Sequence, residues 1–298
     1  MAGADTRHKL LLAAGFVLGA GIFAWVLRSA LDQAAPPSRC ADGMLLAGPR
    51  CCGEGQTLEL GRCVGRPERC AKGLEVHENG CVAPNRMIVI QGGVLRIGTG
   101  DWEAQGQITP RTVEIPSFAI DAYEVHEARY AACVAASACT PVVLSGEPGR
   151  AVGGVSLDEA ARFCKWAGGA LPTADQLAYA AAGSSGRRYA WGETGAVCRR
   201  GAWGLVNGPC GEGATGPEVT GSHPDGASPD GVFDLAGNVA EWTAPSEKGL
   251  ALVDVRGGSF MDSAASALRS WHRREVDRNT RAADIGFRCV YALDKPQR

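Results

Sequence analysis

The first apolar run of the chain covers residues 10–27, LLLAAGFVLGAGIFAWVL, and contains no charged residue. As a helix it would be about 27 Å long, which is close to the thickness of a bilayer core. Arg7 and Lys9 precede it, so the positive charge lies on its N-terminal side. The pattern predicts a single-pass signal anchor, with residues 1–9 in the cytoplasm and the rest of the chain outside it.

A cleaved signal peptide is the alternative for the same segment. Such peptides need a small-x-small cleavage site, for which the sequence SALDQAAPP after Arg28 offers only weak candidates. We favour the uncleaved anchor, followed by a Pro-containing linker over residues 28–39. Both alternatives place the later cysteines in an oxidising compartment, and we expect this to be a Gram-negative periplasm.

Residues 40–85 form a cysteine-rich module with few apolar positions. Three of the gaps between its six cysteines are ten residues long, and each gap contains Gly and a few apolar residues. We interpret them as three hairpins, each closed by its own disulfide, because so short a stretch buries too little apolar surface to fold unaided. Other pairings are possible, but the expected ones are Cys40–Cys51, Cys52–Cys63 and Cys70–Cys81.

From residue 86 onward the pattern changes to apolar, β-rich runs and two amphipathic helices. MIVIQGGVLRIGTG predicts strands that end at glycines. In VSLDEAARFCKWAGG the apolar residues recur at helical spacing, and Ser156 with Glu159 forms a capping box. Thr173 is the expected N-cap of the second helix, in LPTADQLAYAAAG. After Gly183 the pattern predicts mostly turns and short strands.

Composition narrows the functional classes. The 298 residues have a net charge of -2 and no Lys/Arg-rich run, which argues against a nucleic-acid partner. The 41 glycines indicate a loop-rich fold. Twelve cysteines behind an export signal indicate disulfides. A cytosolic zinc protein is the alternative, but no C-x-x-C spacing occurs.

Five motifs occur in an order that resembles the formylglycine-generating (sulfatase-modifying factor) family. They are FCKWAGGALPTADQLAYAA, RRYAWGE, SPDGVFDLAGNVAEW, VRGGSF and DIGFRCV. The resemblance implies an irregular, loop-rich α+β domain over residues 86–298, related to C-type lectins. The high glycine content agrees with such a fold.

The resemblance also implies a disulfide between Cys164 and Cys289, which closes a long loop. The family's second long-range disulfide falls on Ala181 and His272, so both of its cysteines are missing here. Two local pairs are expected as well: Cys133–Cys139 and Cys198–Cys210.

The oxidative chemistry of the family is not preserved. Its oxidases hold copper between two cysteine thiolates, because Cu(I) prefers soft ligands. These cysteines fall on Asp262 and Ala267, and neither a carboxylate nor a methyl group replaces a thiolate. Ser259 matches the family, whereas an aromatic residue of its substrate site is replaced by Ala240. We therefore expect no copper, and Ser259, Asp262 and Ala267 form only a remnant of the catalytic pocket.

A remodelled active site is the alternative for the same pocket. Asp262, His272 and Asp277 would have to converge there to form a new metal or acid/base site. Against this, no HExxH, Walker or dinucleotide-binding motif occurs. The simpler interpretation is that Asp262 is a solvated loop residue and that His272 lies at the surface.

The motif FDLAGNVAEW is the strongest candidate for a retained site, because the resemblance implies a structural calcium ion there. Calcium prefers carboxylate and carbonyl oxygens in a tight turn. The implied ligands are the Asp234 and Glu241 side chains and the carbonyls of Gly237 and Val239. The alternative needs no ion: Asp234 and Asn238 would cap turns. Glu241 would then pair with an arginine such as Arg256 or Arg288.

These features predict a membrane-anchored, exported protein that is not a copper-dependent oxidase. We expect a binding or structural module of the cell envelope, with an envelope protein or a glycan as partner. The alternative is an oxidoreductase of the same superfamily, active in sulfatase maturation or in oxidation of the non-heme-iron type.

Overall fold

The computed structural model describes residues 39–98, 101, 104, 106–247 and 250–293. The predicted membrane anchor, residues 10–27, lies outside these ranges, as does nearly all of the linker over 28–39. No helix in the described part of the chain is long and apolar enough to cross a bilayer.

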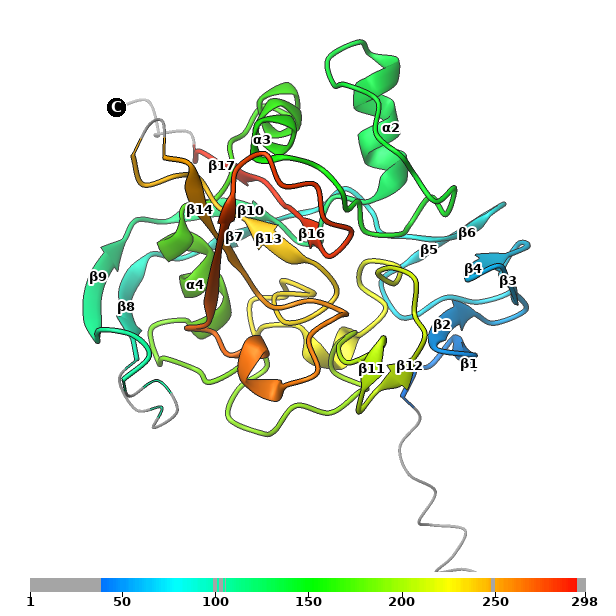
Figure 1. Ribbon diagram of the computed structural model, residues 1–298, viewed down its shortest axis with the longest axis horizontal. Helices are drawn as coiled ribbons and strands as arrows, with labels where there is room; N and C mark the ends of the chain where they lie inside the picture. The colour runs from blue at the N-terminus through cyan, green and yellow to red at the C-terminus, as the bar shows by residue number, and fades with distance from the viewer. Residues whose placement is uncertain (1–38, 99–100, 102–103, 105, 248–249, 294–298) are drawn as a thin grey trace, which may run out of the picture. The chain divides into compact units, whose positions relative to one another are not determined.

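Three antiparallel hairpins follow one another at the start of the described chain (Figure 1). They pair β1 (Met44–Ala47) with β2 (Arg50–Gly53), β3 (Thr57–Glu59) with β4 (Arg62–Val64), and β5 (Glu75–His77) with β6 (Gly80–Val82). Their disulfides are the three expected from the ten-residue gaps: Cys40–Cys51, Cys52–Cys63 and Cys70–Cys81.

The rest of the chain forms small sheets joined by long irregular segments (Figure 1). One sheet has the order β15-β14-β13-β16, another has the order β17-β10-β7, and two further pairs are β8-β9 and β11-β12. The strands are β7 (Met87–Ile90), β8 (Gly93–Ile97), β9 (Arg111–Ile115), β10 (Phe118–Asp121), β11 (Asn207–Gly208), β12 (Gly211–Glu212), β13 (Ala240–Trp242), β14 (Leu252–Arg256), β15 (Arg273–Asp277), β16 (Ile285–Gly286) and β17 (Val290–Tyr291). This is the loop-rich α+β architecture that the sequence predicts.

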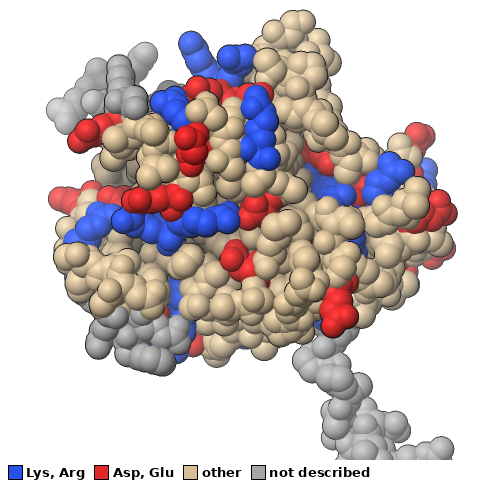
Figure 2. Space-filling view, viewed as in Figure 1, with Lys and Arg blue, Asp and Glu red and all other residues tan. Residues whose placement is uncertain are grey.

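The two predicted helices begin at their predicted caps. The Ser156 and Glu159 side chains bond each other's backbone N–H groups in a capping box, and Thr173 does the same with Gln176. The helical segments are α2 (Glu127–Ala135), α3 (Leu157–Trp166), α4 (Ala174–Ala182) and the short 3-10 helices η2 (Pro224–Gly226) and η3 (Ala265–Leu268). Residues 131–145, the end of α2 and the segment after it, contain no charged residue, and Figure 2 shows the region around α2 mostly in tan.

One hydrophobic core packs α2 and α3 against the four-stranded sheet. Tyr130 and Phe163 stack on each other, and Phe287 meets both rings edge-on. Trp242 is fully buried and donates its indole N–H to the Val155 carbonyl at 2.9 Å. The remaining disulfides, at Cys164–Cys289, Cys133–Cys139 and Cys198–Cys210, are also those expected from the sequence.

The described residues from 39 onward form one compact unit, in which the cysteine-rich hairpins pack against the residues that follow them. The physical reason is a set of buried ion pairs. Arg50, from the second strand of the first hairpin, is completely buried and bonds Glu147 of the main domain at 2.6 Å. An arginine buried in this way needs its partner in place, because an unpaired buried charge is strongly destabilising.

Candidate functional site

The turn that carries FDLAGNVAEW is held by buried side chains. Asp234 and Asn238 both adopt a positive φ, of 55° and 60°, which Asn and Asp tolerate better than most residues. Asp234 accepts a hydrogen bond from the Gly221 N–H at 2.5 Å. Asn238 accepts from the Glu218 N–H at 2.8 Å, so the turn is tied to the loop that precedes it.

Glu241, on β13, forms an ion pair with Arg288. The Arg288 Nε lies 2.7 Å from Oε2 and its Nη2 lies 2.6 Å from Oε1, so the contact is bidentate. Both side chains are essentially without solvent exposure, at 1% and 0%. Burial raises the pKa of Glu241, and Arg288 opposes that rise. Of the two arginines considered from the sequence, the structure selects Arg288.

A third carboxylate, Glu124, lies in the same buried cluster and was not anticipated from the sequence. It accepts from the Asn238 side-chain amide at 2.6 Å and from the Val239 N–H at 3.1 Å. Burial raises the pKa of Glu124 well above its ordinary value, and the negative charges of Asp234 and Glu241 add to the rise. No local motif marks this residue, because it follows β10, more than a hundred positions away from the turn.

One of the expected calcium ligands, the Glu241 carboxylate, is already engaged by an arginine in this arrangement. Both oxygens of Glu241 accept from Arg288, whose positive charge would repel a cation at the same carboxylate. Within the described ranges, one group of three His, Cys, Asp or Glu donors lies close enough together for a metal: Cys51, Glu218 and His223. The Cys51 sulfur is bonded to Cys40 and is not a thiolate. Calcium therefore stays a prediction, and its test is given in the Discussion.

The remnant pocket is organised around Ser259, which is fully buried. Its hydroxyl donates to Asp262 at 3.0 Å, and the same Asp262 oxygen accepts from the Ser259 backbone N–H at 2.8 Å. Asp262 is thus bonded back onto the turn rather than simply solvated. Ala267, on η3, packs beside this turn: a Cβ on Gly258 would lie 2.7 Å from the Ala267 carbonyl oxygen. The structure thus brings Ser259, Asp262 and Ala267 together.

Of the three residues that a remodelled acid/base site would need, the structure places two near each other, Asp262 and His272. His272 is partly buried; burial lowers its pKa, and the nearby charge of Asp262 opposes that effect. Asp277 does not join them, since its carboxylate accepts from the Asn279 N–H at 2.8 Å in a turn. Asp284 was missed by the sequence reasoning; it lies 3.4 Å from the Ser259 hydroxyl and is bonded by Arg274 at 2.8 Å.

No free cysteine occurs among the described residues, since all twelve cysteines are in disulfides.

A model of the sulfatase-modifying factor enzyme 1-like domain matches residues 75–293. The chain belongs to this family. The family match therefore confirms the family that the order of the five motifs predicted.

The relatives of this chain include a formylglycine-generating enzyme and a protein described as an inactive formylglycine-generating enzyme. This chain is 31% identical over 178 residues to the formylglycine-generating enzyme of Streptomyces coelicolor, covering 51% of this chain and 55% of that one. It is 31% identical over 156 residues to the inactive C-alpha-formylglycine-generating enzyme 2 of Mus musculus, covering 48% and 49%. The chain thus spans about half the length of these curated relatives.

Solved structures share the fold at low sequence identity. The structure of PvdO from Pseudomonas aeruginosa aligns with a TM-score of 0.57 at 22% identity, covering 70% of this chain and 94% of that chain. CarF aligns with a TM-score of 0.51 at 20% identity, covering 71% and 99%. At such identities the likeness supports the fold alone.

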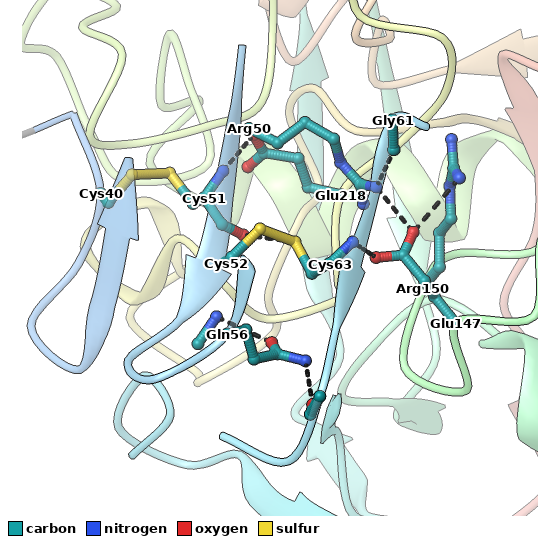
Figure 3. The surroundings of a disulfide bond; sticks show 12 residues. Cys40, Arg50, Cys51, Cys52, Gln56, Gly61, Cys63, Glu147, Arg150 and Glu218 are labelled. Carbon is teal, nitrogen blue, oxygen red and sulfur yellow. Dashed lines mark hydrogen bonds and ion pairs between the residues drawn. A yellow bond between two sulfur atoms is a disulfide. The ribbon is translucent and has the colours of Figure 1, made fainter. Parts of the chain in front are cut away.

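The sulfatase-modifying factor match begins at residue 75, yet earlier residues reach into the domain. Figure 3 shows Arg50 between the Gly61 carbonyl and Glu147, and the Cys51 N–H directed at Glu218. Glu218 also accepts from Arg39 at 2.6 Å. Its second oxygen lies 2.7 Å from His223 Nε2. The first two hairpins are thus joined to the family domain through two buried carboxylates, Glu147 and Glu218.

The Glu218–His223 pair predicts a pH-dependent stability. Burial alone lowers the pKa of His223, but the hydrogen bond and charge of Glu218 outweigh it, so the net pKa lies above the ordinary 6.5. The stabilisation by His223 is therefore fully present below pH 6.5 and is lost as pH rises through the raised pKa. In urea denaturation, the wild-type chain should exceed His223→Gln in unfolding free energy most at about pH 6, and less at about pH 9. A difference that does not change with pH would contradict this assignment.

Proposed function

We propose that this protein is a non-oxidase member of the sulfatase-modifying factor family that serves as a binding module outside the cytoplasm. The observation that supports this most directly is the pair Asp262 and Ala267 at the positions where the resemblance expects copper-binding cysteines. The first position holds a carboxylate that is hydrogen-bonded to Ser259, and the second holds a buried methyl group. Neither supplies the soft thiolate that Cu(I) prefers.

Two further observations support the non-catalytic part of the proposal. Relatives from Mus musculus and Bos taurus are described as inactive formylglycine-generating enzymes, so loss of catalysis has precedent among similar chains. The Ser259 hydroxyl is directed at two acidic side chains and has no histidine among its hydrogen-bond partners to act as a base.

The location is part of the same proposal. Six disulfides need an oxidising compartment to form and persist. Together with the apolar segment at residues 10–27, they favour a domain that is exported and held at a membrane, with the periplasm of a Gram-negative cell as the expected compartment. The proposed partner is then an envelope protein or a glycan.

An activity assay tests the proposal. The full-length chain, produced in an oxidising compartment and supplied with copper, is expected to form no aldehyde on a cysteine-containing sulfatase peptide. Asp262→Cys combined with Ala267→Cys is the matched variant, and it is expected to gain Cu(I) binding, measured by metal analysis. Aldehyde formed by the unmodified chain, or iron or copper that co-purifies with it, would overturn the proposal and favour the oxidoreductase alternative.

A further inference from the structure

A pocket of about 820 Å³ lies away from the remnant pocket and contains none of Ser259, Asp262 and Ala267. Its wall is formed by residues 141–145 after α2, by residues 150–154, by residues 215–217 and by the chain around Arg281. The volume is in the range of ligand-binding pockets, which is about 300–1,000 Å³.

One wall of this pocket presents an unpaired backbone. Residues 141–145 run without turn or bend, and the backbones of Val142, Val143 and Leu144 make no hydrogen bond to another backbone group in the described part of the chain. Glu127 holds the segment at its far end by accepting from the N–H groups of Ser145 and Gly146, each at 2.9 Å. The segment is therefore fixed in place while its own donors and acceptors stay available, as at the edge of a sheet.

The side chains of residues 142–144 are apolar. Val142 and Leu144 are partly buried against the hydrophobic core, whereas Val143 is exposed. Val143 is 98% exposed, and it belongs to the uncharged stretch of residues 131–145 around α2 in Figure 2. Charged residues make up 21% of the chain, so an exposed stretch of this length without charge differs from the rest of the surface. A contiguous uncharged surface beside a pocket is typical of a protein-binding site.

The charged groups of the pocket favour an acidic ligand. Its carboxylates are already satisfied: Glu127 accepts two backbone N–H groups, and Glu159 accepts from Ser156, Thr140 and Arg281. The Arg281 guanidinium, in contrast, is half exposed and makes one hydrogen bond, to Glu159 at 2.6 Å. Arg281 therefore keeps unused N–H donors at the pocket, although its charge is paired with Glu159, and a carboxylate complements such donors.

We infer that this pocket binds an extended acidic segment of a partner protein. The segment pairs its main chain with residues 142–144, places an apolar side chain against Val143, and directs a carboxylate toward Arg281. This is strand addition, in which main-chain hydrogen bonds supply affinity and alternate side chains supply specificity. The inference rests on the proposed binding function and names the class of partner.

Peptide selection on the full-length chain tests the inference. A phage-displayed library of random short peptides is expected to yield sequences with Asp or Glu beside apolar residues at alternate positions. The synthesised peptides are then measured by fluorescence anisotropy. Val143→Asp and Arg281→Ala are each expected to weaken binding about tenfold or more, which corresponds to about 1.4 kcal/mol. Replacing the peptide's acid by its amide should remove most of the effect of Arg281→Ala.

Leu252→Asp is the matched control, because Leu252 is an exposed apolar residue that lines a different pocket of about 730 Å³. It is expected to bind the peptides as the wild type does, and thermal unfolding confirms that each variant is folded. Failure to enrich any acidic peptide, or equal binding by Val143→Asp and the wild type, would overturn the inference. Either result leaves the non-oxidase assignment intact, since that depends on Asp262 and Ala267 and on the aldehyde assay.

Discussion

Glu241→Ala is expected to lower the free energy of unfolding by about 3–5 kcal/mol. The change leaves the Arg288 guanidinium without the carboxylate that holds two of its nitrogens, in a site with no solvent exposure. The backbone carbonyl of Phe233, 2.8 Å from Arg288 Nη2, cannot neutralise the charge. Urea denaturation at neutral pH measures the loss.

Asp254→Ala provides the control for an ion pair at the surface. Asp254 pairs with Arg273 at 2.7 Å, but the arginine side chain is 45% exposed, so its loss should cost less than about 1 kcal/mol. Equal destabilisation by the two variants would show that the Glu241–Arg288 pair is not the main contact of Glu241.

The Glu241→Ala variant also tests the calcium prediction. If Asp234 and Glu241 bind calcium, added calcium raises the unfolding temperature of the wild-type chain by mass action, and Glu241→Ala abolishes the increment. If the Glu241 carboxylate stays hydrogen-bonded to Arg288, as the bidentate contact indicates, then neither calcium nor a chelator shifts the unfolding temperature of the wild type. Differential scanning calorimetry separates the two outcomes.

Removal of the Cys164–Cys289 disulfide is expected to lower the free energy of unfolding about as much as Glu241→Ala does. The bridge closes a loop of 125 residues, and chain entropy alone then predicts a loss of about 5 kcal/mol when both cysteines are replaced by alanine. Both sulfurs are fully buried in the core that packs α3 against the sheet, so the substitution also removes packing. Chemical denaturation under non-reducing conditions measures the difference.

The local disulfide Cys198–Cys210 is the comparison for the long-range one. Its cysteines are separated by 12 residues, so the same argument predicts a loss of about 3 kcal/mol for the double alanine variant. A larger loss at this local bridge than at Cys164–Cys289 would contradict the account based on loop length.

The sequence alone was sufficient for features that depend on neighbouring residues. The capping boxes at Ser156 and Thr173 are set by side chains three residues apart, and they start α3 and α4 where expected. The three N-terminal hairpins followed from ten-residue gaps between cysteines for the same reason. The family followed from motifs, each of which is local in the chain, and the family match over residues 75–293 confirms it.

Tertiary structure alone decided which distant charges meet. Glu241 had two arginine candidates, and only the packing of the segment before β17 against β13 brings Arg288 to it. Glu124 and Asp284 enter the two buried clusters from segments that no local pattern connects with them. Glu218 is placed among charges from remote parts of the chain, and its contact with Arg39 spans 179 positions. Buried charges must be paired, but the chain order does not say with which partner, because the pairing is fixed by the packing of the whole domain.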